Sequence, residues 1–215
     1  MDAIILAAGL GKRSMLNYPK QLLRLGGIPI LIKIINIFQS IDEIDNIIVT
    51  VIPSEKDFFN VIMKKYGIED VMIVDGGSTR QESVYNGLQY VKSKNVIIHE
   101  AARPFIKNEY IRQLIDDEYE NVIPVIDIPF TIYDIKNKKH LNRDDIKNVQ
   151  LPQKFNTELL KEAHEKLKGQ NFTDDSSLYC SYYNNYKIKY IQGWEENFKI
   201  TNSHDVKLAR CIDDE

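Results

Sequence analysis

The amino-acid sequence predicts an α/β fold built on a doubly wound, mostly parallel β-sheet with a protruding β-hairpin arm. Residues 3–8 form a continuous apolar run that ends at Gly9, which is typical of a strand buried on both faces. Strand-like and helical segments then alternate up to residue 99, as in a parallel sheet with helices on both faces. Short β-prone pieces between residues 126 and 150 interrupt this alternation and predict the arm.

The first βαβ unit follows from the order of the patterns. Residues 3–8 should be the central strand, because an apolar run without polar alternation leaves no face for solvent. Residues 30–40 show the apolar spacing of a helix, and residues 46–52 read as a second β-branched strand before Pro53. Strand, helix and strand in this order predict a βαβ unit.

The alternation continues along the first half of the chain. Helical patterns at residues 57–66 and 83–91 alternate with strand patterns at residues 71–74 and 95–99. Open α/β sheets bind ligands outside the carboxyl ends of their strands. We therefore expect a functional site at that edge of the sheet.

The second half begins with the arm and then returns to the α/β pattern. Two β-prone pieces, residues 130–135 and 146–150, flank a polar Lys-Asn-Lys-Lys-His turn and predict a hairpin that leaves the sheet. Ser203 is expected to cap the last helix. The elements expected after the arm are helices at residues 156–168, 174–182 and 203–212, and a strand at residues 187–192.

Length, charge and cysteine content restrict the class of protein. The 215 residues suit one domain, residues 1–215, with the arm at about 126–150 within it. Its 28 basic and 31 acidic residues are mixed along the chain, so the net charge of −3 predicts neither a nucleic-acid nor a membrane partner. Cys180 and Cys211 lack the spacing of a disulfide framework or a metal site, and residues 3–8 are too short for a signal or a membrane span. We expect a cytoplasmic protein.

A glycine-rich loop with two cations follows the first strand. Gly9 and Gly11 permit turns that aim consecutive backbone N–H groups at an anion, and Lys12 and Arg13 add positive charge. Lys20 follows within reach and is placed to neutralise a leaving pyrophosphate. The alternative for this segment is an ordinary strand-to-helix turn with surface cations.

Three further strand ends supply glycines or charged side chains. Paired glycines at residues 76–77 precede Ser83, which is positioned to cap a helix or to bind a base or ribose. Glu100 can hold Mg²⁺, Arg103 can bind a phosphate, and Lys199 can reach the same crevice from the far end of the chain. Each feature alone is equally typical of a capped turn, a surface ion pair or a solvated lysine. Their recurrence at one edge of the sheet favours a phosphate-binding site.

Seven pieces of the sequence, in order along nearly the whole chain, resemble the motifs of one enzyme family. They are Ala7-Ala8-Gly9-x-Gly11-x-Arg13, Pro19-Lys20-Gln21, Gly76-Gly77-x-x-Arg80-x-x-Ser83-Val84-x-Asn86-Gly87-Leu88, Ala101-Ala102-Arg103-Pro104, Pro152-Gln153-x-Phe155, Thr173-Asp174-Asp175 and Asn197-x-Lys199-Ile200-Thr201. The chain thus resembles the cytidylyltransferases of the 2-C-methyl-D-erythritol 4-phosphate type and their ribitol 5-phosphate relatives. The resemblance implies a Rossmann-like nucleotidyltransferase fold.

The resemblance also implies roles for individual residues. The catalytic residues are the cations expected around the triphosphate, Arg13, Lys20 and Lys199. The nucleotide-binding residues are Ala7, Ala8, Gly9, Gly11, Lys12, Gly76, Gly77, Arg80, Ser83 and Ala101. The acceptor-binding residues are Arg103, Thr131, Arg143 and Thr173, and Glu100 would hold the cofactor Mg²⁺.

The implied substrates are CTP and a small phosphorylated alcohol. An oxygen of the acceptor phosphate attacks the α-phosphorus of CTP in line, and pyrophosphate leaves. The phosphate nucleophile is already ionised, so positioning and charge neutralisation suffice without a Ser–His pair or a carboxylate base. The resemblance further implies a homodimer, in which the arm sends Arg143 into the partner subunit's acceptor site.

The chain departs from the family pattern at the metal and acceptor positions. Glu100 stands where the family has Asp, which moves the carboxylate by about one bond length. Ile128 and Leu151 stand where the family has Thr, and Lys147 replaces an aromatic residue. Thr131 is expected to replace one of the two missing hydroxyls if the arm carries a short insertion.

Several functions therefore stay open at this point. The favoured acceptor is 2-C-methyl-D-erythritol 4-phosphate, and ribitol 5-phosphate or another cell-surface polyol or sugar phosphate is the alternative. A sugar-1-phosphate or molybdopterin nucleotidyltransferase would share the glycine-rich loop but not the Ala-Ala-Arg-Pro and Pro-Gln pieces. The non-enzyme alternative is a degenerate nucleotide-binding scaffold, against which the retained cations argue.

Overall fold

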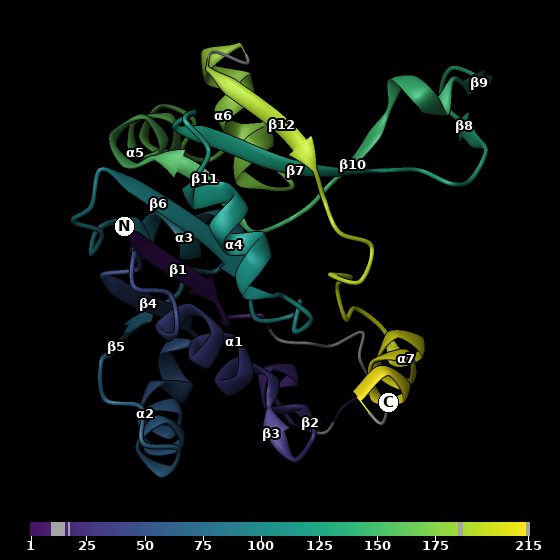
Figure 1. Cartoon of the computed structure of the whole chain (residues 1–215). Helices are drawn as coiled ribbons and strands as arrows, with labels where there is room; N and C mark the ends of the chain where they lie inside the picture. Colours follow the sequence, from purple (N-terminus) through teal and green to yellow (C-terminus); the bar gives the residue numbers. More distant parts are fainter. Residues whose placement is uncertain (10–15, 17, 185–186, 214–215) are drawn as a thin grey trace.

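The computed structural model describes residues 1–9, 16, 18–184 and 187–213. Its main sheet has eight strands in the order β10-β7-β11-β6-β1-β4-β5, with β12 paired to β7. β1 (Asp2–Leu6) is central and parallel to both β4 (Asn46–Val51) and β6 (Asn95–Glu100). β5 (Val71–Asp75) continues the parallel half beside β4. The predicted α/β fold and its central strand are confirmed (Figure 1).

The other half of the sheet is mixed. β11 (Gln153–Asn156) runs antiparallel between β6 and β7 (Asn121–Asp127). β12 (Ile188–Gln192) is parallel to β7, and β10 (Lys147–Val149) is antiparallel to it. The sequence patterns did not predict β7 or β11. β11 was hidden because its Gln153 and Lys154 are polar yet buried, and the Lys154 ammonium donates to the Asp117 carbonyl at 2.8 Å.

Helices cover both faces of the sheet because successive side chains of a strand point in opposite directions. Ile5 belongs to one core and its neighbour Ile4 to the other. The first core is covered by α1 (Ile30–Gln39), α2 (Lys56–Lys65) and α4 (Asn108–Ile115). The second is covered by α3 (Arg80–Leu88), α5 (Thr157–Lys166) and α6 (Asp175–Tyr183). The doubly wound arrangement is confirmed, with α4 as an addition that the patterns missed.

Two helices begin where short polar side chains cap them. α3 begins three residues earlier than expected, because the Thr79 hydroxyl accepts from the Glu82 N–H at 3.1 Å. α7 (Ser203–Asp213) is capped by Asn202, whose Oδ1 accepts from the N–H groups of His204 at 2.8 Å and Asp205 at 3.1 Å. The expectation that Ser203 is the cap was therefore wrong by one residue.

The arm is a hairpin that projects from the body of the molecule (Figure 1). β8 (Ile132–Asp134) and β9 (Lys139–Leu141) pair with each other in a separate two-stranded sheet. The arm is shorter than the expected 126–150, because the second β-prone piece forms β10 and pairs with β7 in the main sheet. A 3₁₀ turn, η4 (Arg143–Asp145), precedes that return.

The remaining elements form a small third core beside the sheet. β2 (Arg24–Leu25) and β3 (Ile28–Pro29) make a short hairpin that contacts α7. Two 3₁₀ turns, η2 (Lys20–Leu22) and η3 (Pro53–Glu55), complete the described secondary structure. Within the described residues, none of the helices combines the length and apolar character that a membrane crossing requires.

Candidate active site

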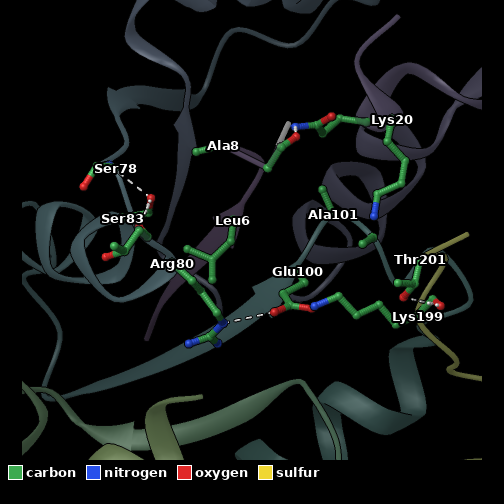
Figure 2. A pocket seen from close by; sticks show the side chains of 15 residues that line it. Leu6, Ala8, Lys20, Ser78, Arg80, Ser83, Glu100, Ala101, Lys199 and Thr201 are labelled. Atoms are coloured by element: carbon green, nitrogen blue, oxygen red, sulfur yellow. Dashed lines mark hydrogen bonds and ion pairs between the residues drawn. The ribbon is translucent and has the colours of Figure 1, made fainter. Parts of the chain in front are cut away.

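A cavity of about 430 Å³ opens beyond the carboxyl ends of β1 and β6. Its walls come from the loop after β1, η2, the start of α3, the turn after β6 and the segment between β12 and α7. Figure 2 shows Arg80, Glu100 and Lys199 in a row across the cavity, with Lys20 approaching from another side. This is the edge of the sheet at which the sequence placed the ligand site.

Most of the predicted triphosphate and nucleotide residues meet at this cavity. Those that line it are Ala8, Gly9, Lys20, Gly77, Arg80, Ser83, Ala101 and Lys199, and Glu100, the predicted metal residue, lies among them. Ala7 is buried behind the wall, and Gly76 is the first residue of the loop after β5 and packs on Ala8. The predictions for Gly11, Lys12 and Arg13 lie outside the described residues.

A side-chain amide holds the loop after β1. Gln21 donates from Nε2 to the carbonyl oxygens of Ala7 and Gly9, the latter at 3.0 Å. The Lys20 ammonium donates to the Ile200 carbonyl at 2.6 Å, which ties η2 to the segment that carries Lys199. The Gln21 contacts hold residues 7–9 by their carbonyl groups, whereas an anion would bind backbone N–H groups.

The second glycine loop packs directly on the first. A Cβ on Gly76 would lie 2.6 Å from the Cβ of Ala8 and 3.0 Å from the Val51 carbonyl oxygen, so only glycine permits this approach. The Ser83 hydroxyl accepts from the Gly77 N–H at 3.0 Å and donates to the Thr79 carbonyl at 2.9 Å. Ser83 thus shapes the loop as well as lining the cavity.

Glu100 is an ionised carboxylate surrounded by cations. Its Oε1 accepts from Arg80 Nε at 3.0 Å, and its Oε2 lies 2.7 Å from Lys199 Nζ and 3.9 Å from Arg103 Nε. Burial alone would raise the pKa of Glu100, but Arg80, Lys199 and Arg103 outweigh that effect and lower it to about 2. The cavity therefore holds one full negative charge among several positive ones.

Arg80 is itself held by a second buried carboxylate. Its Nη2 donates to Asp175 Oδ2 at 2.8 Å, and Asp175 Oδ1 lies 3.2 Å from His164 Nε2. Burial would raise the pKa of Asp175, yet the charge of Arg80 and the hydrogen bond with His164 lower it to about 2. The guanidinium of Arg80 is therefore fixed between the carboxylates of Glu100 and Asp175. The sequence patterns did not assign this contact to Asp175.

Glu100 is also the residue that the sequence assigns to Mg²⁺. The described residues contain no group of three or more His, Cys, Asp or Glu side chains that could enclose a metal ion. Magnesium in nucleotide sites commonly uses one or two carboxylates and takes its other ligands from phosphates and water. An ionised Glu100 on the cavity wall fits a site of that kind.

The predicted acceptor residues do not line this cavity. Arg103 lies beside it and donates from Nη1 to the Asn197 carbonyl at 2.9 Å. Thr173 is exposed next to the start of α6. Thr131 and Arg143 are exposed on the arm, where Arg143 donates to the Pro129 carbonyl at 2.9 Å. The described structure therefore does not bring these four residues together around the cavity.

Several cavity residues escaped the sequence analysis. They are Leu6, Gln21, Ser78, Thr79, Ala102 and Thr201. Gln21 and Thr201 lie within pieces that carried the family resemblance, and Thr79 precedes Glu82 by three residues, which is the spacing of an N-cap. Ala102 also lies within one of those pieces, and Leu6 is an apolar residue at a strand end that gave no chemical signal.

Known proteins with similar sequences share one description. A family model described as 2-C-methyl-D-erythritol 4-phosphate cytidylyltransferase matches residues 1–214. The protein of that name from Geobacillus thermodenitrificans is 34% identical over 220 residues, which cover 98% of this chain and 96% of the relative. Its counterpart from Bacteroides fragilis is 35% identical over 216 residues, which cover 98% of each chain.

Solved structures agree with the sequence comparison. The crystal structure of 4-diphosphocytidyl-2C-methyl-D-erythritol synthase from Anaerococcus prevotii has a TM-score of 0.86 at 28% identity and covers 100% of this chain and 96% of that one. The bifunctional IspDF from Campylobacter jejuni has a TM-score of 0.83 at 30% identity, over 96% of this chain and 53% of that one. From its motifs, its cavity and these similarities, the chain belongs to the 2-C-methyl-D-erythritol 4-phosphate cytidylyltransferase family.

Proposed function

We propose that the protein transfers a cytidylyl group from CTP to 2-C-methyl-D-erythritol 4-phosphate and releases pyrophosphate. The observation that carries this proposal is the convergence of Lys20, Arg80 and Lys199 on one cavity in a member of this family. These cations come from three distant parts of the chain, and the walls between them are glycine-rich loops. Such a site suits a highly charged nucleotide.

The reaction forms a bond between an acceptor phosphate oxygen and the α-phosphorus of CTP. The bond from that phosphorus to the oxygen that departs with pyrophosphate breaks. Lys20 and Lys199 would neutralise charge on the triphosphate and on the leaving group, and the loops at Gly9 and Gly77 would orient the nucleotide. Since the acceptor phosphate is ionised at neutral pH, the site needs no general base.

A divalent cation, Mg²⁺ in this proposal, would be held by Glu100 together with phosphate oxygens. When bound, the ion would neutralise negative charge on the phosphates. Glu100 can serve because its low pKa keeps it ionised throughout the neutral range. Arg80 would keep the carboxylate in place through its contact with Oε1.

We also propose that residues 1–215 act as one nucleotidyltransferase domain that pairs with a second copy through the arm. The hairpin exposes large apolar side chains, with Phe130 75%, Tyr133 50% and Ile135 83% accessible. Such clusters are typical of interaction surfaces. Arg143 would then serve the partner subunit's acceptor site. Cys180 and Cys211 are free thiols, as suits the reducing cytoplasm.

The test is pyrophosphate release from CTP and Mg²⁺ with 2-C-methyl-D-erythritol 4-phosphate as acceptor. We expect turnover with this acceptor and with CTP in preference to UTP or GTP. Lys20→Ala should lower kcat/KM by about 100-fold, because it removes a charge aimed at the phosphates. Lys64→Ala, which changes an exposed lysine of α2 away from the cavity, is the matched control and should leave kcat/KM unchanged.

Parallel wells decide between the other candidate functions. Release with ribitol 5-phosphate alone would mean that Ile128 and Leu151 redirect acceptor choice. Turnover with UTP or GTP but not CTP would contradict the cytidylyl donor. Calorimetric binding of CTP without turnover of any polyol phosphate would favour the scaffold alternative.

A further inference from the structure

The segment that delivers Lys199 has no regular secondary structure of its own. Residues 193–202 connect β12 to α7 and carry both Lys199 and Thr201 to the cavity. The side chain of Lys199 is 39% accessible, so packing around that side chain does not fix its position. The ion pair with Glu100 holds the ammonium group, and tertiary contacts of the backbone set where the side chain starts.

Gln150 makes the first of these contacts with both ends of its amide. Its Oε1 accepts from the Trp194 N–H at 2.9 Å, and its Nε2 donates to the Trp194 carbonyl at 2.9 Å. Gln150 is 2% accessible and has its own N–H bonded to the Pro124 carbonyl at 2.9 Å. Two hydrogen bonds to one residue restrain the rotation of the Trp194 backbone as well as its position.

Gly193 makes this close contact possible. A Cβ at residue 193 would lie 2.5 Å from Gln150 Oε1 and 3.2 Å from the Val125 carbonyl oxygen. The N–H of Gly193 donates to that same Val125 carbonyl at 2.8 Å. The start of the segment is therefore fixed against both β7 and Gln150.

Further contacts carry this alignment to Lys199. Asn197, which is fully buried, donates from Nδ2 to the Leu151 carbonyl at 2.5 Å. Ile200 donates its N–H to the Ala102 carbonyl at 2.8 Å. Lys199 thus lies between two anchors, and its ammonium reaches Glu100 Oε2 at 2.7 Å.

We propose that Gln150 is a positioning residue for Lys199, acting through Trp194 on the segment that places the ammonium at the triphosphate. The inference rests on the proposed function, because it requires Lys199 to act on CTP. A displacement of about 1 Å at a group in a phosphate-transfer site can cost about 100-fold in rate. Gln150 also follows β10 directly, so the returning strand of the arm and the Lys199 segment share one anchor.

Gln150→Leu keeps the size of the side chain and removes both hydrogen bonds to Trp194. We expect kcat to fall at least tenfold and CTP binding to weaken, because Lys199 loses its alignment. Gln150→Glu, which keeps the acceptor for the Trp194 N–H but not the donor, should give an intermediate loss. Asn121→Leu is the matched control, since Asn121 is a buried amide that bonds Tyr179 and Lys187 away from the cavity. It should lower Tm but leave kcat unchanged below the unfolding transition.

A double-mutant cycle separates positioning from a general loss of structure. Calorimetry would give the Kd of CTP for the intact protein, Gln150→Leu, Lys199→Ala and the double variant. If Gln150 acts through Lys199, Gln150→Leu weakens binding severalfold in the intact protein and by less than twofold in the Lys199→Ala background. An equal loss in both backgrounds, or no loss in the intact protein, would overturn the inference.

Gly193→Ala disturbs the contact between Gln150 and the Trp194 backbone by a change at residue 193. It replaces Gln150→Leu as the test if that variant does not fold. The new methyl group should displace the Gln150 amide and lower kcat, and adding Gln150→Ala should cause no further loss. Additive losses of kcat in the double variant would contradict the proposed role of Gln150. Turnover by the unmodified protein tests the proposed function separately, so a failure there is distinguishable from a failure of this inference.

Discussion

Glu100 is stabilised as a carboxylate by three cations that come from different parts of the chain. Arg80 begins α3, Arg103 follows β6, and Lys199 lies in the segment before α7. Removing one partner of such a buried arrangement leaves the others uncompensated, which costs more than the arrangement contributes as a whole. The charge of Glu100 therefore matters for folding as well as for the proposed binding of a metal ion.

Glu100→Gln should destabilise the protein by about 3 kcal/mol at pH 7, because Arg103 and Lys199 lose their counter-charge and Arg80 keeps only Asp175. The substitution should also make the free energy of unfolding depend less on pH in the acid range. The folded pKa of about 2 lies below the ordinary value of 4.5, so the unfolded state binds the proton more tightly. The stabilisation is complete above about pH 4.5 and is lost as pH falls toward 2.

Urea unfolding at a series of pH values measures this effect. Glu100→Asp keeps the charge and should keep more of the acid dependence than Glu100→Gln. Glu69→Gln, at an exposed position, is the control and should reproduce the profile of the unmodified protein. A Glu100→Gln profile parallel to that of the unmodified protein would contradict the assignment of an ionised Glu100.

At the scale of elements, the site depends on two strand-end loops that touch. The loop after β1 contributes Ala8 and the loop after β5 contributes Gly76, and they approach closely because Gly76 has no side chain. α3 begins immediately beyond the second loop and directs Arg80 and Ser83 to the cavity. The relative placement of these elements, rather than any one side chain, shapes this wall of the cavity.

Gly76→Ala should therefore separate the two loops and weaken CTP binding by about tenfold or more, since the added Cβ would lie 2.6 Å from that of Ala8. Calorimetry with CTP measures the loss. Ala8→Gly in the same chain removes the opposing methyl group and should recover part of the affinity. If the double variant binds no better than Gly76→Ala alone, the contact between the loops is not the cause.

At the scale of the whole molecule, the arm lies apart from the main sheet and presents apolar side chains to solvent. Phe130 and Ile135 are among the most exposed large hydrophobic residues, and Thr131 and Arg143 lie on the same arm, away from the cavity of their own chain. A second copy would cover this surface and bring Arg143 to an acceptor site. In the proposed dimer, oligomeric state and activity are therefore linked.

Phe130→Ser combined with Ile135→Ser should convert a dimer into a monomer, because the substitutions remove the apolar surface proposed to bind the partner. Size-exclusion chromatography with light scattering measures the mass. Phe58→Ser combined with Val61→Ser, on exposed positions of α2, is the matched control and should remain dimeric. A monomeric unmodified protein would refute the proposed pairing.

The sequence by itself determined the parallel half of the sheet and most of the residues that line the cavity. The apolar run at residues 3–8 and the glycines at residues 76–77 act through local backbone chemistry, which one stretch of sequence contains in full. The motif pieces also predicted that Lys20, Arg80 and Lys199 lie at one edge of the sheet, where the carboxyl ends of the parallel strands meet. All three line the cavity at that edge.

Only the tertiary structure decided the contacts that hold those side chains. β11 is a strand although Gln153 and Lys154 are polar, because the fold supplies partners for both. Asp175 fixes Arg80, and Gln150 holds Trp194, across separations of 95 and 44 residues. Such long-range pairs leave no periodicity in the sequence, since a polar side chain there is indistinguishable from a solvated one until the chain has folded around it.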